Sequence, residues 1–302
     1  MKPILKNELS ILIPTYNYPC RKLVECLAEQ TSIIQSENNS FKFEIIVAED
    51  GSTDYLDENR CIDKIKNCKH IVRSENTGRA CIRNFLAQQT SYNWLLFIDS
   101  DMVVYDKEFI LNYISNNSET VVDGGVKIMG DYDSLKNNLR FIYEKSSEKE
   151  HTYNKRKKNP FAHFHTANFI IKRDIMLAHP FDERFRKYGY EDVLLGKYLK
   201  SSGIPIEHID NPLSFEVFET NKEFIGKTEE GLRTLYDFRQ ELDGYSNILN
   251  AKRKTDRLHI SGAIRLFHKL FGKAIRKNLI GNKPDIRLFN IYKLGFYLLS
   301  YP

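Results

Sequence analysis

Hydrophobic and polar residues alternate along the first hundred positions in blocks whose lengths predict strands and helices. Apolar runs of strand length cover Leu9–Pro14, Phe43–Ala48 and Trp94–Ile98, and a further short strand is expected at Lys69–Arg73. Between them, apolar residues recur at helical spacing in Cys20–Gln30, Asp54–Lys66 and Thr77–Gln89. Strands that alternate with helices of this length predict an α/β fold with a parallel sheet of the nucleotide-binding type.

The pattern beyond residue 105 is less regular. It predicts helices at Phe109–Ser115 and Glu191–Ser201, and strands at Thr120–Met129 and Phe169–Ile171. The Lys-rich stretch Glu144–Lys158 is expected to be a mobile or helical surface segment. A lid over a ligand crevice would have this character, although a solvated charged face explains it better.

Composition narrows the class of protein. A chain of 302 residues with 41% hydrophobic and 28% charged residues is typical of a globular protein with a sizeable core. No N-terminal signal is evident, and no run approaches the roughly 20 apolar residues that span a bilayer, so a cytoplasmic protein is expected. The five cysteines are odd in number and lack C-x-x-C spacing, which argues against a disulfide framework and a zinc site.

The net charge of +5 is distributed unevenly. From residue 252 to residue 302 there are twelve Lys or Arg against Asp256 and Asp285, a net charge of +10. One helical stripe of this tail is apolar and contains Ile260, Ile264, Phe267, Leu270, Phe271, Ala274 and Ile275. We weigh two interpretations equally. The tail could be a basic amphipathic helix that binds the anionic inner surface of the membrane, or a helix that packs on the catalytic domain. Nucleic acid is not expected as a partner, because no recognised binding module accompanies the charge.

Three predicted strands end in polar motifs. These are Pro14-Thr15-Tyr16-Asn17, Glu49-Asp50-Gly51-Ser52 and Asp99-Ser100-Asp101. The carboxyl ends of parallel strands lie at one edge of a sheet, where open α/β sheets bind ligands. The three motifs are therefore expected to converge on one crevice.

Each motif has a functional and a structural interpretation. Asp99 and Asp101 offer hard oxygen ligands suited to Mg²⁺ or Mn²⁺, which can neutralise a diphosphate, although an isolated D-x-D is more often a turn and a helix cap. Tyr16 can stack on a base or sugar. Asp50 can accept a hydrogen bond from a ring N–H, or simply belong to an Asp-Gly turn with Gly51. Arg79 and Arg83, four residues apart, can counter a diphosphate or face solvent.

Taken in order, the motifs carry a family resemblance. The segments I-P-T-Y-N, E-D-G-S-T-D, E-N-T-G-R-A-C-I-R-N and W-L-L-F-I-D-S-D-M resemble the family 2 inverting glycosyltransferases of GT-A fold over residues 9–105. Further on, Phe181-Asp182-Glu183-Arg184-Phe185 and Gly189-Tyr190-Glu191-Asp192 look like a segment of galactosyl- and N-acetylgalactosaminyltransferases, including the chondroitin-polymerase type. Five ordered motifs are far more specific than any one of them.

The resemblance implies a role for each site residue. Pro14, Thr15, Tyr16, Asn17, Asp50, Gly51, Arg79, Arg83, Asp99, Ser100 and Asp101 would bind the nucleotide-sugar, with Tyr16 and Asp50 on the uracil. Asp101 would coordinate Mn²⁺ or Mg²⁺, Asp99 would bind near the ribose or a metal-bound water, and Asp192 would be the catalytic base beside Glu191. Helix capping is the alternative for the last two.

One departure from the family concerns the metal. Relatives often supply a His after the E-D helix and its following strand, whereas here Glu216 is the nearest oxygen ligand. Glu216 is therefore the candidate further ligand. His165 and Asn168 are candidate acceptor contacts, although a structural role is the better explanation for a lone His.

The resemblance also implies an organisation and an activity. Residues 1–250 would form the GT-A domain, with a nucleotide-sugar half at 1–105 and an acceptor and catalytic-base half at 106–250, followed by a basic helical tail at 251–302. The enzyme would move a sugar of Gal, GalNAc, GlcNAc or Glc type from UDP to a hydroxyl of a glycan, lipid-linked or free, in surface polysaccharide or glycoconjugate synthesis. A GDP- or dTDP-sugar donor, and a non-catalytic sugar-binding or scaffold protein, remain alternatives.

Overall fold

A seven-stranded sheet organises the part of the chain that carries the strand-end motifs. The computed structural model describes residues 2–301 and places the strands in the order β3-β2-β1-β4-β7-β6-β8. Their bounds are β1 Glu8–Thr15, β2 Lys42–Asp50, β3 Cys68–Arg73, β4 Trp94–Ile98, β6 Val121–Asp123, β7 Asn168–Lys172 and β8 Ile206–His208. Only β7 runs against its neighbours, β4 and β6. The predicted mostly parallel sheet is confirmed, and β2, β1 and β4, which end in the three polar motifs, are adjacent.

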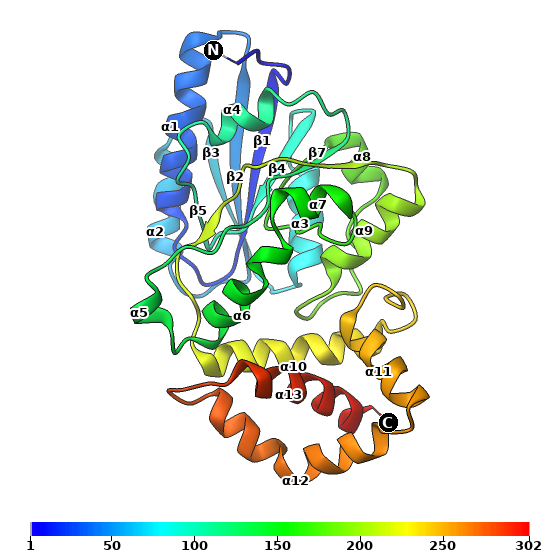
Figure 1. Cartoon of the computed structure of the whole chain (residues 1–302). Coiled ribbons are helices and arrows are strands. Elements are labelled where there is room, and N and C mark those ends of the chain that lie inside the picture. Colours follow the sequence, from blue (N-terminus) through cyan, green and yellow to red (C-terminus); the bar gives the residue numbers. More distant parts are fainter. Residues whose placement is uncertain (1, 302) are drawn as a thin grey trace. The chain divides into compact units, whose positions relative to one another are not determined.

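Helices cover both faces of this sheet (Figure 1). They are α1 Arg21–Glu37, α2 Leu56–Arg60, α3 Arg79–Gln88, α4 Phe109–Ile114, α7 Tyr153–Lys158 and α8 Arg173–Ala178. Side chains alternate between faces along a strand, so Leu9, Ile11 and Ile13 of β1 share one face. They lie in a buried cluster with apolar residues of α1 and α4. On the other side of β1, α3 packs against the strand and against α8.

Two predicted elements differ from the observed ones. The helix expected over 54–66 is divided into α2 and a 3₁₀ turn at Cys61–Lys64. The strand predicted over Thr120–Met129 is wrong beyond β6, which ends at Asp123. The chain bends there because Gly124-Gly125 follows, with Gly125 at a φ of +83°. The segment predicted as mobile or helical, Glu144–Lys158, is mostly helical.

A small two-stranded sheet lies outside the main one. It pairs β5, Met102–Val103, with β9, Ser214–Phe215, in antiparallel register. Because β5 begins directly after Asp101, this pairing fixes the backbone that leaves the D-x-D motif.

The chain divides into two units, each with its own core. The first contains residues 2–127, 150–186 and 195–216, and the second contains residues 128–149, 187–194 and 217–301. Helices of the second unit are α5 Tyr132–Leu135, α6 Leu139–Ser147, α10 Asn221–Asp237, α11 Asn247–Arg257, α12 Ser261–Leu279 and α13 Ile286–Ser300; α9, Glu191–Ser201, begins in it. The expected helical C-terminal region is confirmed, whereas the domain boundary at residue 250 stays a prediction.

The core of the second unit is aromatic and aliphatic. Within this unit α13 packs against α10, α11 and α12, as Figure 1 shows in red, yellow and orange. Its buried cluster contains Leu139, Phe224, Ile225, Ile275, Leu279, Phe289 and Tyr292. None of the helices described in residues 2–301 is long and apolar enough to cross a membrane.

Candidate active site

The loop after β1 is joined to the loop after β2 by one asparagine. The Asn17 side-chain oxygen accepts hydrogen bonds from the backbone N–H of Thr53 at 2.8 Å and of Asp54 at 3.0 Å. The Asn17 N–H in turn donates to the Ser52 hydroxyl at 2.9 Å. Asn17 has a φ of 50°, a left-handed conformation that asparagine tolerates well. The first two motifs therefore lie side by side, and Tyr16 between them is 54% exposed.

The Asp50 carboxylate is engaged by the chain itself. It accepts from the backbone N–H of Gly78 at 2.8 Å and of Thr77 at 3.1 Å, and from the Arg73 guanidinium at 2.9 Å. Only 4% of Asp50 is exposed. Its present contacts order the N-terminus of α3, so binding a nucleobase would require Asp50 to share or exchange these partners.

Gly51 allows the loop after β2 to come close to the loop after β3, which contains Glu75 and Asn76. It has a φ of +73°, and a Cβ there would lie 2.4 Å from the backbone nitrogen of Asn76. Any larger residue would separate the two loops. Beside it, Glu49 is fully buried and accepts hydrogen bonds from Asn59 and Ser52, with His70 at 3.0 Å. Burial raises the pKa of Glu49, but these hydrogen bonds outweigh it and lower the pKa below its ordinary value.

Arg83 of α3 forms a buried ion pair with the first aspartate of the D-x-D motif. Its guanidinium donates to the Asp99 carboxylate at 2.6 Å, and the side chains of Arg83 and Asp99 are 2% and 16% exposed. The guanidinium also lies 5.5 Å from the centre of the Phe181 ring. Arg79, one turn earlier on α3, is exposed. The structure thus gives the two predicted diphosphate cations different surroundings: Arg83 neutralises Asp99 inside the protein, and Arg79 lies at the surface.

The Phe181-Asp182-Glu183 segment is held against α3 by Asn84. The Asn84 side chain donates to the Phe181 carbonyl at 2.9 Å and to the Glu183 carboxylate at 3.0 Å, and it accepts from the Phe181 N–H at 2.9 Å. Sequence reasoning missed this role of Asn84, although the residue lies inside one motif and its partners inside another. The two motifs therefore form one structural feature.

The β5–β9 pairing brings Glu216, a third carboxylate residue, next to Asp101 of the D-x-D motif. The backbone N–H of Glu216 donates to the carbonyl of Asp101 at 2.9 Å. The Tyr18 hydroxyl donates to the Glu216 carboxylate at 2.9 Å. Burial, then the hydrogen bond to Glu216, raises the pKa of Tyr18 well above its ordinary value, so the phenol stays protonated as a donor. Tyr18 was not predicted, because 198 residues separate it from Glu216.

The donor set around Asp101 suits a hard divalent cation. No group of three or more His, Cys, Asp or Glu within residues 2–301 is arranged to hold a metal by itself. Mg²⁺ is usually held by one or two carboxylates together with substrate phosphates rather than by an all-protein cage. Asp101 and Glu216, joined by backbone pairing, fit that kind of site.

Glu191 and Asp192 open α9 in the second unit. Both lie in the first turn, where the helix dipole favours the charged carboxylate. Glu191 is 5% exposed, and Asp192 is half-buried. The Asp192 carboxylate accepts from the backbone N–H of Val193 at 2.7 Å. Tyr190 precedes them with a φ of 71°, and Gly189 with a φ of 100°, so the chain makes a left-handed turn into the helix.

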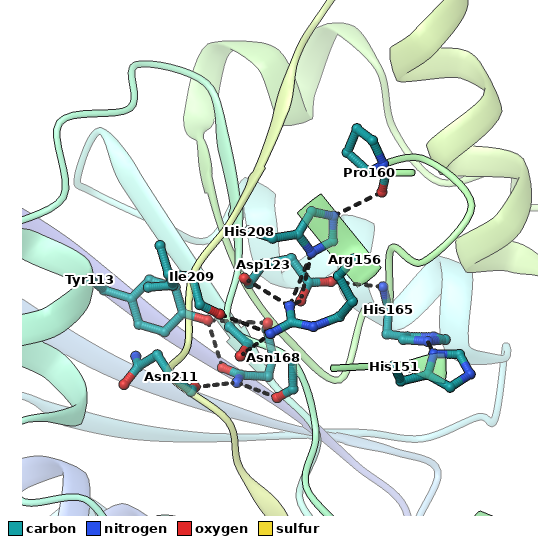
Figure 2. A network of polar contacts seen from close by, with 12 residues as sticks. Tyr113, Asp123, His151, Arg156, Pro160, His165, Asn168, His208, Ile209 and Asn211 are labelled. Carbon is teal, nitrogen blue, oxygen red and sulfur yellow. Dashed lines mark hydrogen bonds and ion pairs between the residues drawn. The ribbon is translucent and has the colours of Figure 1, made fainter. Parts of the chain in front are cut away.

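A buried polar network surrounds the candidate acceptor residues of the first unit (Figure 2). Arg156 of α7 donates to the Asp123 carboxylate at 2.7 Å and lies 3.0 Å from the His208 ring. The backbone N–H of His165 donates to Asp123 at 2.9 Å, while the His165 ring lies 3.4 Å from that of His151. Arg156 therefore anchors the Lys-rich segment to the sheet.

Asn168 occupies a supporting position as the first residue of β7. Its side chain donates to the carbonyls of Gly125 and Asn211 at 2.8 and 3.0 Å and accepts from the Tyr113 hydroxyl at 2.8 Å. With 1% of the residue exposed, these contacts place Asn168 inside the fold. Its predicted contact with an acceptor stays a prediction, as does that of His165.

Solved structures share this architecture. A mannosyltransferase of Pyrobaculum calidifontis in complex with GDP-Man and Mn²⁺ is 12% identical, with a TM-score of 0.55 over 97% of this chain and 85% of that one. S. aureus TarS in complex with UDP-GlcNAc is 16% identical, with a TM-score of 0.51 over 97% of this chain and 90% of that one. At these identities the likeness shows the fold alone, and the fold is that of GT-A glycosyltransferases.

The sequence match is to a specific family. The model of glycosyl transferase family 2 matches residues 10–177, more than half of the chain. The chain belongs to glycosyl transferase family 2.

Curated relatives extend the comparison. Chondroitin synthase of Escherichia coli is 24% identical over 254 residues, which are 74% of this chain and 36% of that protein. An uncharacterized glycosyltransferase of Haemophilus influenzae is 34% identical over 121 residues, 38% of this chain and 46% of that protein. The chain thus spans less than half the length of either relative.

Proposed function

We propose that the protein is a metal-dependent, inverting glycosyltransferase that moves a sugar from a UDP-sugar to a hydroxyl of a glycan. The observation that carries the proposal is the pairing at the D-x-D motif, which joins Glu216 to Asp101 just after β4, a strand inside the residues that the family 2 model matches. A chondroitin synthase among the relatives and a UDP-GlcNAc complex among the structural neighbours support a UDP-sugar and a polysaccharide or glycoconjugate acceptor.

The donor would be held by the motifs of the first unit. Tyr16 would stack on the uracil, Asp50 would meet its polar edge, and Arg79 would approach the diphosphate. Asp101, with Glu216, would hold Mn²⁺ or Mg²⁺, and the bound ion would stabilise the negative charge of the departing diphosphate. Asp99 would remain paired with Arg83, which holds that carboxylate in place.

Asp192 would act as the base. The acceptor hydroxyl oxygen attacks the anomeric carbon on the face opposite the bond to UDP, and its proton passes to the Asp192 carboxylate. The new C–O bond forms as the bond to UDP breaks, and UDP leaves with the electron pair, so the configuration inverts. Glu191 would hydrogen-bond the acceptor. The position of Asp192 in the first turn of α9 supports this role, because the dipole favours the charged base.

A donor panel with Mn²⁺ tests the proposal. UDP-Gal, UDP-GalNAc, UDP-GlcNAc, UDP-Glc and representative GDP- and dTDP-sugars are incubated with glycan acceptors, and products are identified by mass spectrometry. We expect a UDP-sugar to be used and Asp192→Asn to reduce transfer by about 10²–10⁴-fold. A GDP- or dTDP-sugar used in preference would replace the donor assignment. Sugar binding with no transfer or hydrolysis of any donor would favour a scaffold protein.

The chain offers a matched control for Asp192. Asp174 also lies in the first turn of a helix, α8, and also accepts from the next backbone N–H at 2.7 Å. Asp174→Asn changes the same kind of first-turn hydrogen bond, but at a helix outside the predicted site. It should therefore leave transfer unchanged. Equal losses in both variants would mean that helix capping, and not base catalysis, explains the effect.

A further inference from the structure

The surface of α12 carries an apolar face that the protein leaves open. The inner face of this helix, formed by His268, Gly272, Ile275 and Leu279, is buried in the second unit. The predicted stripe is therefore divided: Ile275 packs inward, while Phe267, Leu270 and Phe271 are 42%, 65% and 50% exposed. Leu266, at 58%, and the exposed Ala263 and Ala274 extend the open face. Exposed patches of this kind mark interaction sites.

This open face is wider than one helix. An apolar groove of about 320 Å³ runs beside it, lined by Ile260, Ala263, Ile264, Phe267, Ile291 and Leu294. The last two belong to α13, and Ile291 is itself 44% exposed. Figure 1 shows α12 in orange and α13 in red lying next to each other in this unit.

Positive charge borders the open face on one side. Lys269, Lys273 and Lys277 recur every four residues and are all exposed, so they form a row along α12. The two acidic residues of the tail are used locally: Asp256 binds Lys252 at 2.8 Å, and Asp285 caps α13. Two further basic residues of the tail pair with acids outside it, Arg253 with Asp243 at 2.9 Å and Arg276 with Glu229 at 2.7 Å. The lysine row is therefore the part of the tail's positive charge that borders the open face.

We propose that α12 and the adjoining edge of α13 dock on an anionic lipid bilayer. Phe267, Leu270 and Phe271 would enter the boundary between headgroups and acyl chains, and the lysine row would contact acidic headgroups. One partner then accounts for both the exposed apolar side chains and the lysine row. A second copy of the chain fits less well, because two exposed rows of lysine would face each other. α12 would then lie along the interface, with its apolar side toward the acyl chains.

Co-sedimentation of the full chain with vesicles tests the proposal. We expect binding to vesicles of phosphatidylcholine with phosphatidylglycerol and little to phosphatidylcholine alone. Phe267→Ser/Leu270→Ser/Phe271→Ser should weaken binding by about tenfold or more, because three apolar side chains no longer enter the bilayer. Lys269→Glu/Lys273→Glu/Lys277→Glu should weaken it by about a hundredfold or more. All six side chains are exposed, so the variants should fold, as circular dichroism can verify.

Matched changes on the first unit serve as controls. Leu177→Ser removes another exposed apolar side chain, and Lys64→Glu/Lys66→Glu/Lys69→Glu reverses the same number of exposed charges. Neither should alter vesicle binding. The proposal is overturned if the unchanged chain does not sediment with anionic vesicles. It is also overturned if the α12 variants bind these vesicles as well as the unchanged chain does, or if the control variants lose binding equally. Sedimentation velocity showing a dimer that the apolar variant dissolves would identify a second copy as the partner instead.

A fluorescent reporter localises the contact. The chain has one tryptophan, Trp94, which is 7% exposed in the first unit and gives a constant background. In Leu270→Trp, emission should shift to the blue on anionic vesicles and be quenched by brominated lipid. Leu177→Trp should show neither change. A reporter at residue 270 that stays in water while the protein sediments with vesicles would also contradict the proposal.

Discussion

Arg83 and Asp99 form a buried pair whose stability differs from that of surface ion pairs. Removing one partner of such a pair leaves a charge with neither water nor a counter-ion, which typically costs about 3–5 kcal/mol. Arg83→Met should therefore lower the free energy of unfolding by about 3 kcal/mol, since Asp99 is 16% exposed and retains some solvent. Urea denaturation measures the change.

The neighbouring arginine distinguishes this structural role from diphosphate binding. Arg79→Met alters an exposed side chain one turn away and should change stability by no more than about 0.5 kcal/mol. If both variants lose the same stability, the burial of Arg83 is not the cause. A loss of donor affinity in Arg79→Met without a loss of stability would match its proposed approach to the diphosphate.

The histidines near Arg156 make the first unit sensitive to acid. Burial, followed by the charges of His165 and His163, lowers the pKa of His151 to about 4. In the unfolded chain its pKa is about 6.5, so between these values the unfolded state binds more protons. Stability therefore falls as the pH decreases from about 6.5 toward about 4. The pKa of His163 is lowered in the same direction, first by burial.

Replacement of His151 tests this acid sensitivity. Melting temperatures are compared at about pH 7 and about pH 5. His151→Gln should lose less of its melting temperature on acidification than the unchanged chain, because the group that resists protonation is gone. Glu150 opposes the shift and Arg156 reinforces it, so both are kept. His259→Gln, at an exposed position, should behave like the unchanged chain; a similar gain there would refute the assignment.

At the scale of elements, the short β5–β9 pair positions Glu216. Glu216→Gln keeps the backbone bond to Asp101 but removes a carboxylate charge, so Mn²⁺ should activate transfer only at about tenfold higher concentration. Titration of Mn²⁺ at saturating donor measures this. Glu207→Gln, an exposed change on β8, is the control. An unchanged Mn²⁺ dependence in Glu216→Gln would leave Asp101 as the protein's carboxylate at the metal.

Local patterns explain which elements were predictable. β1, β2 and β4 are apolar runs bounded by turn residues, and such a run can be recognised in a short stretch of sequence. The pairing of Tyr18 with Glu216 depends on a contact between residues 198 positions apart, which no short window contains. Likewise, Arg79 and Arg83 lie four residues apart on the same helix and look equivalent in the sequence. Only the packed fold shows that Arg83 is buried and Arg79 is exposed.

At the scale of the whole molecule, each unit has a core that can be perturbed by itself. In the second unit His268 lies between two glycines on different helices: a Cβ on Gly272 would lie 3.0 Å from its ring, and one on Gly295 would lie 2.5 Å from it and 2.9 Å from its Cβ. The α12–α13 packing thus depends on the missing side chains. His268 is only 7% exposed and has little room to move.

Gly295→Ala should therefore destabilise the second unit. Overpacking costs about 1–3 kcal/mol, which exceeds the gain of up to about 1 kcal/mol from helix propensity. Circular dichroism, dominated by helices, should report an earlier transition, whereas fluorescence of Trp94 in the first unit should be unchanged. Gly226→Ala, in α10, would place its Cβ within 4 Å of no described atom outside the local helix backbone, so it should instead stabilise the same unit. If both probes shift together in Gly295→Ala, the two cores unfold as one cooperative structure.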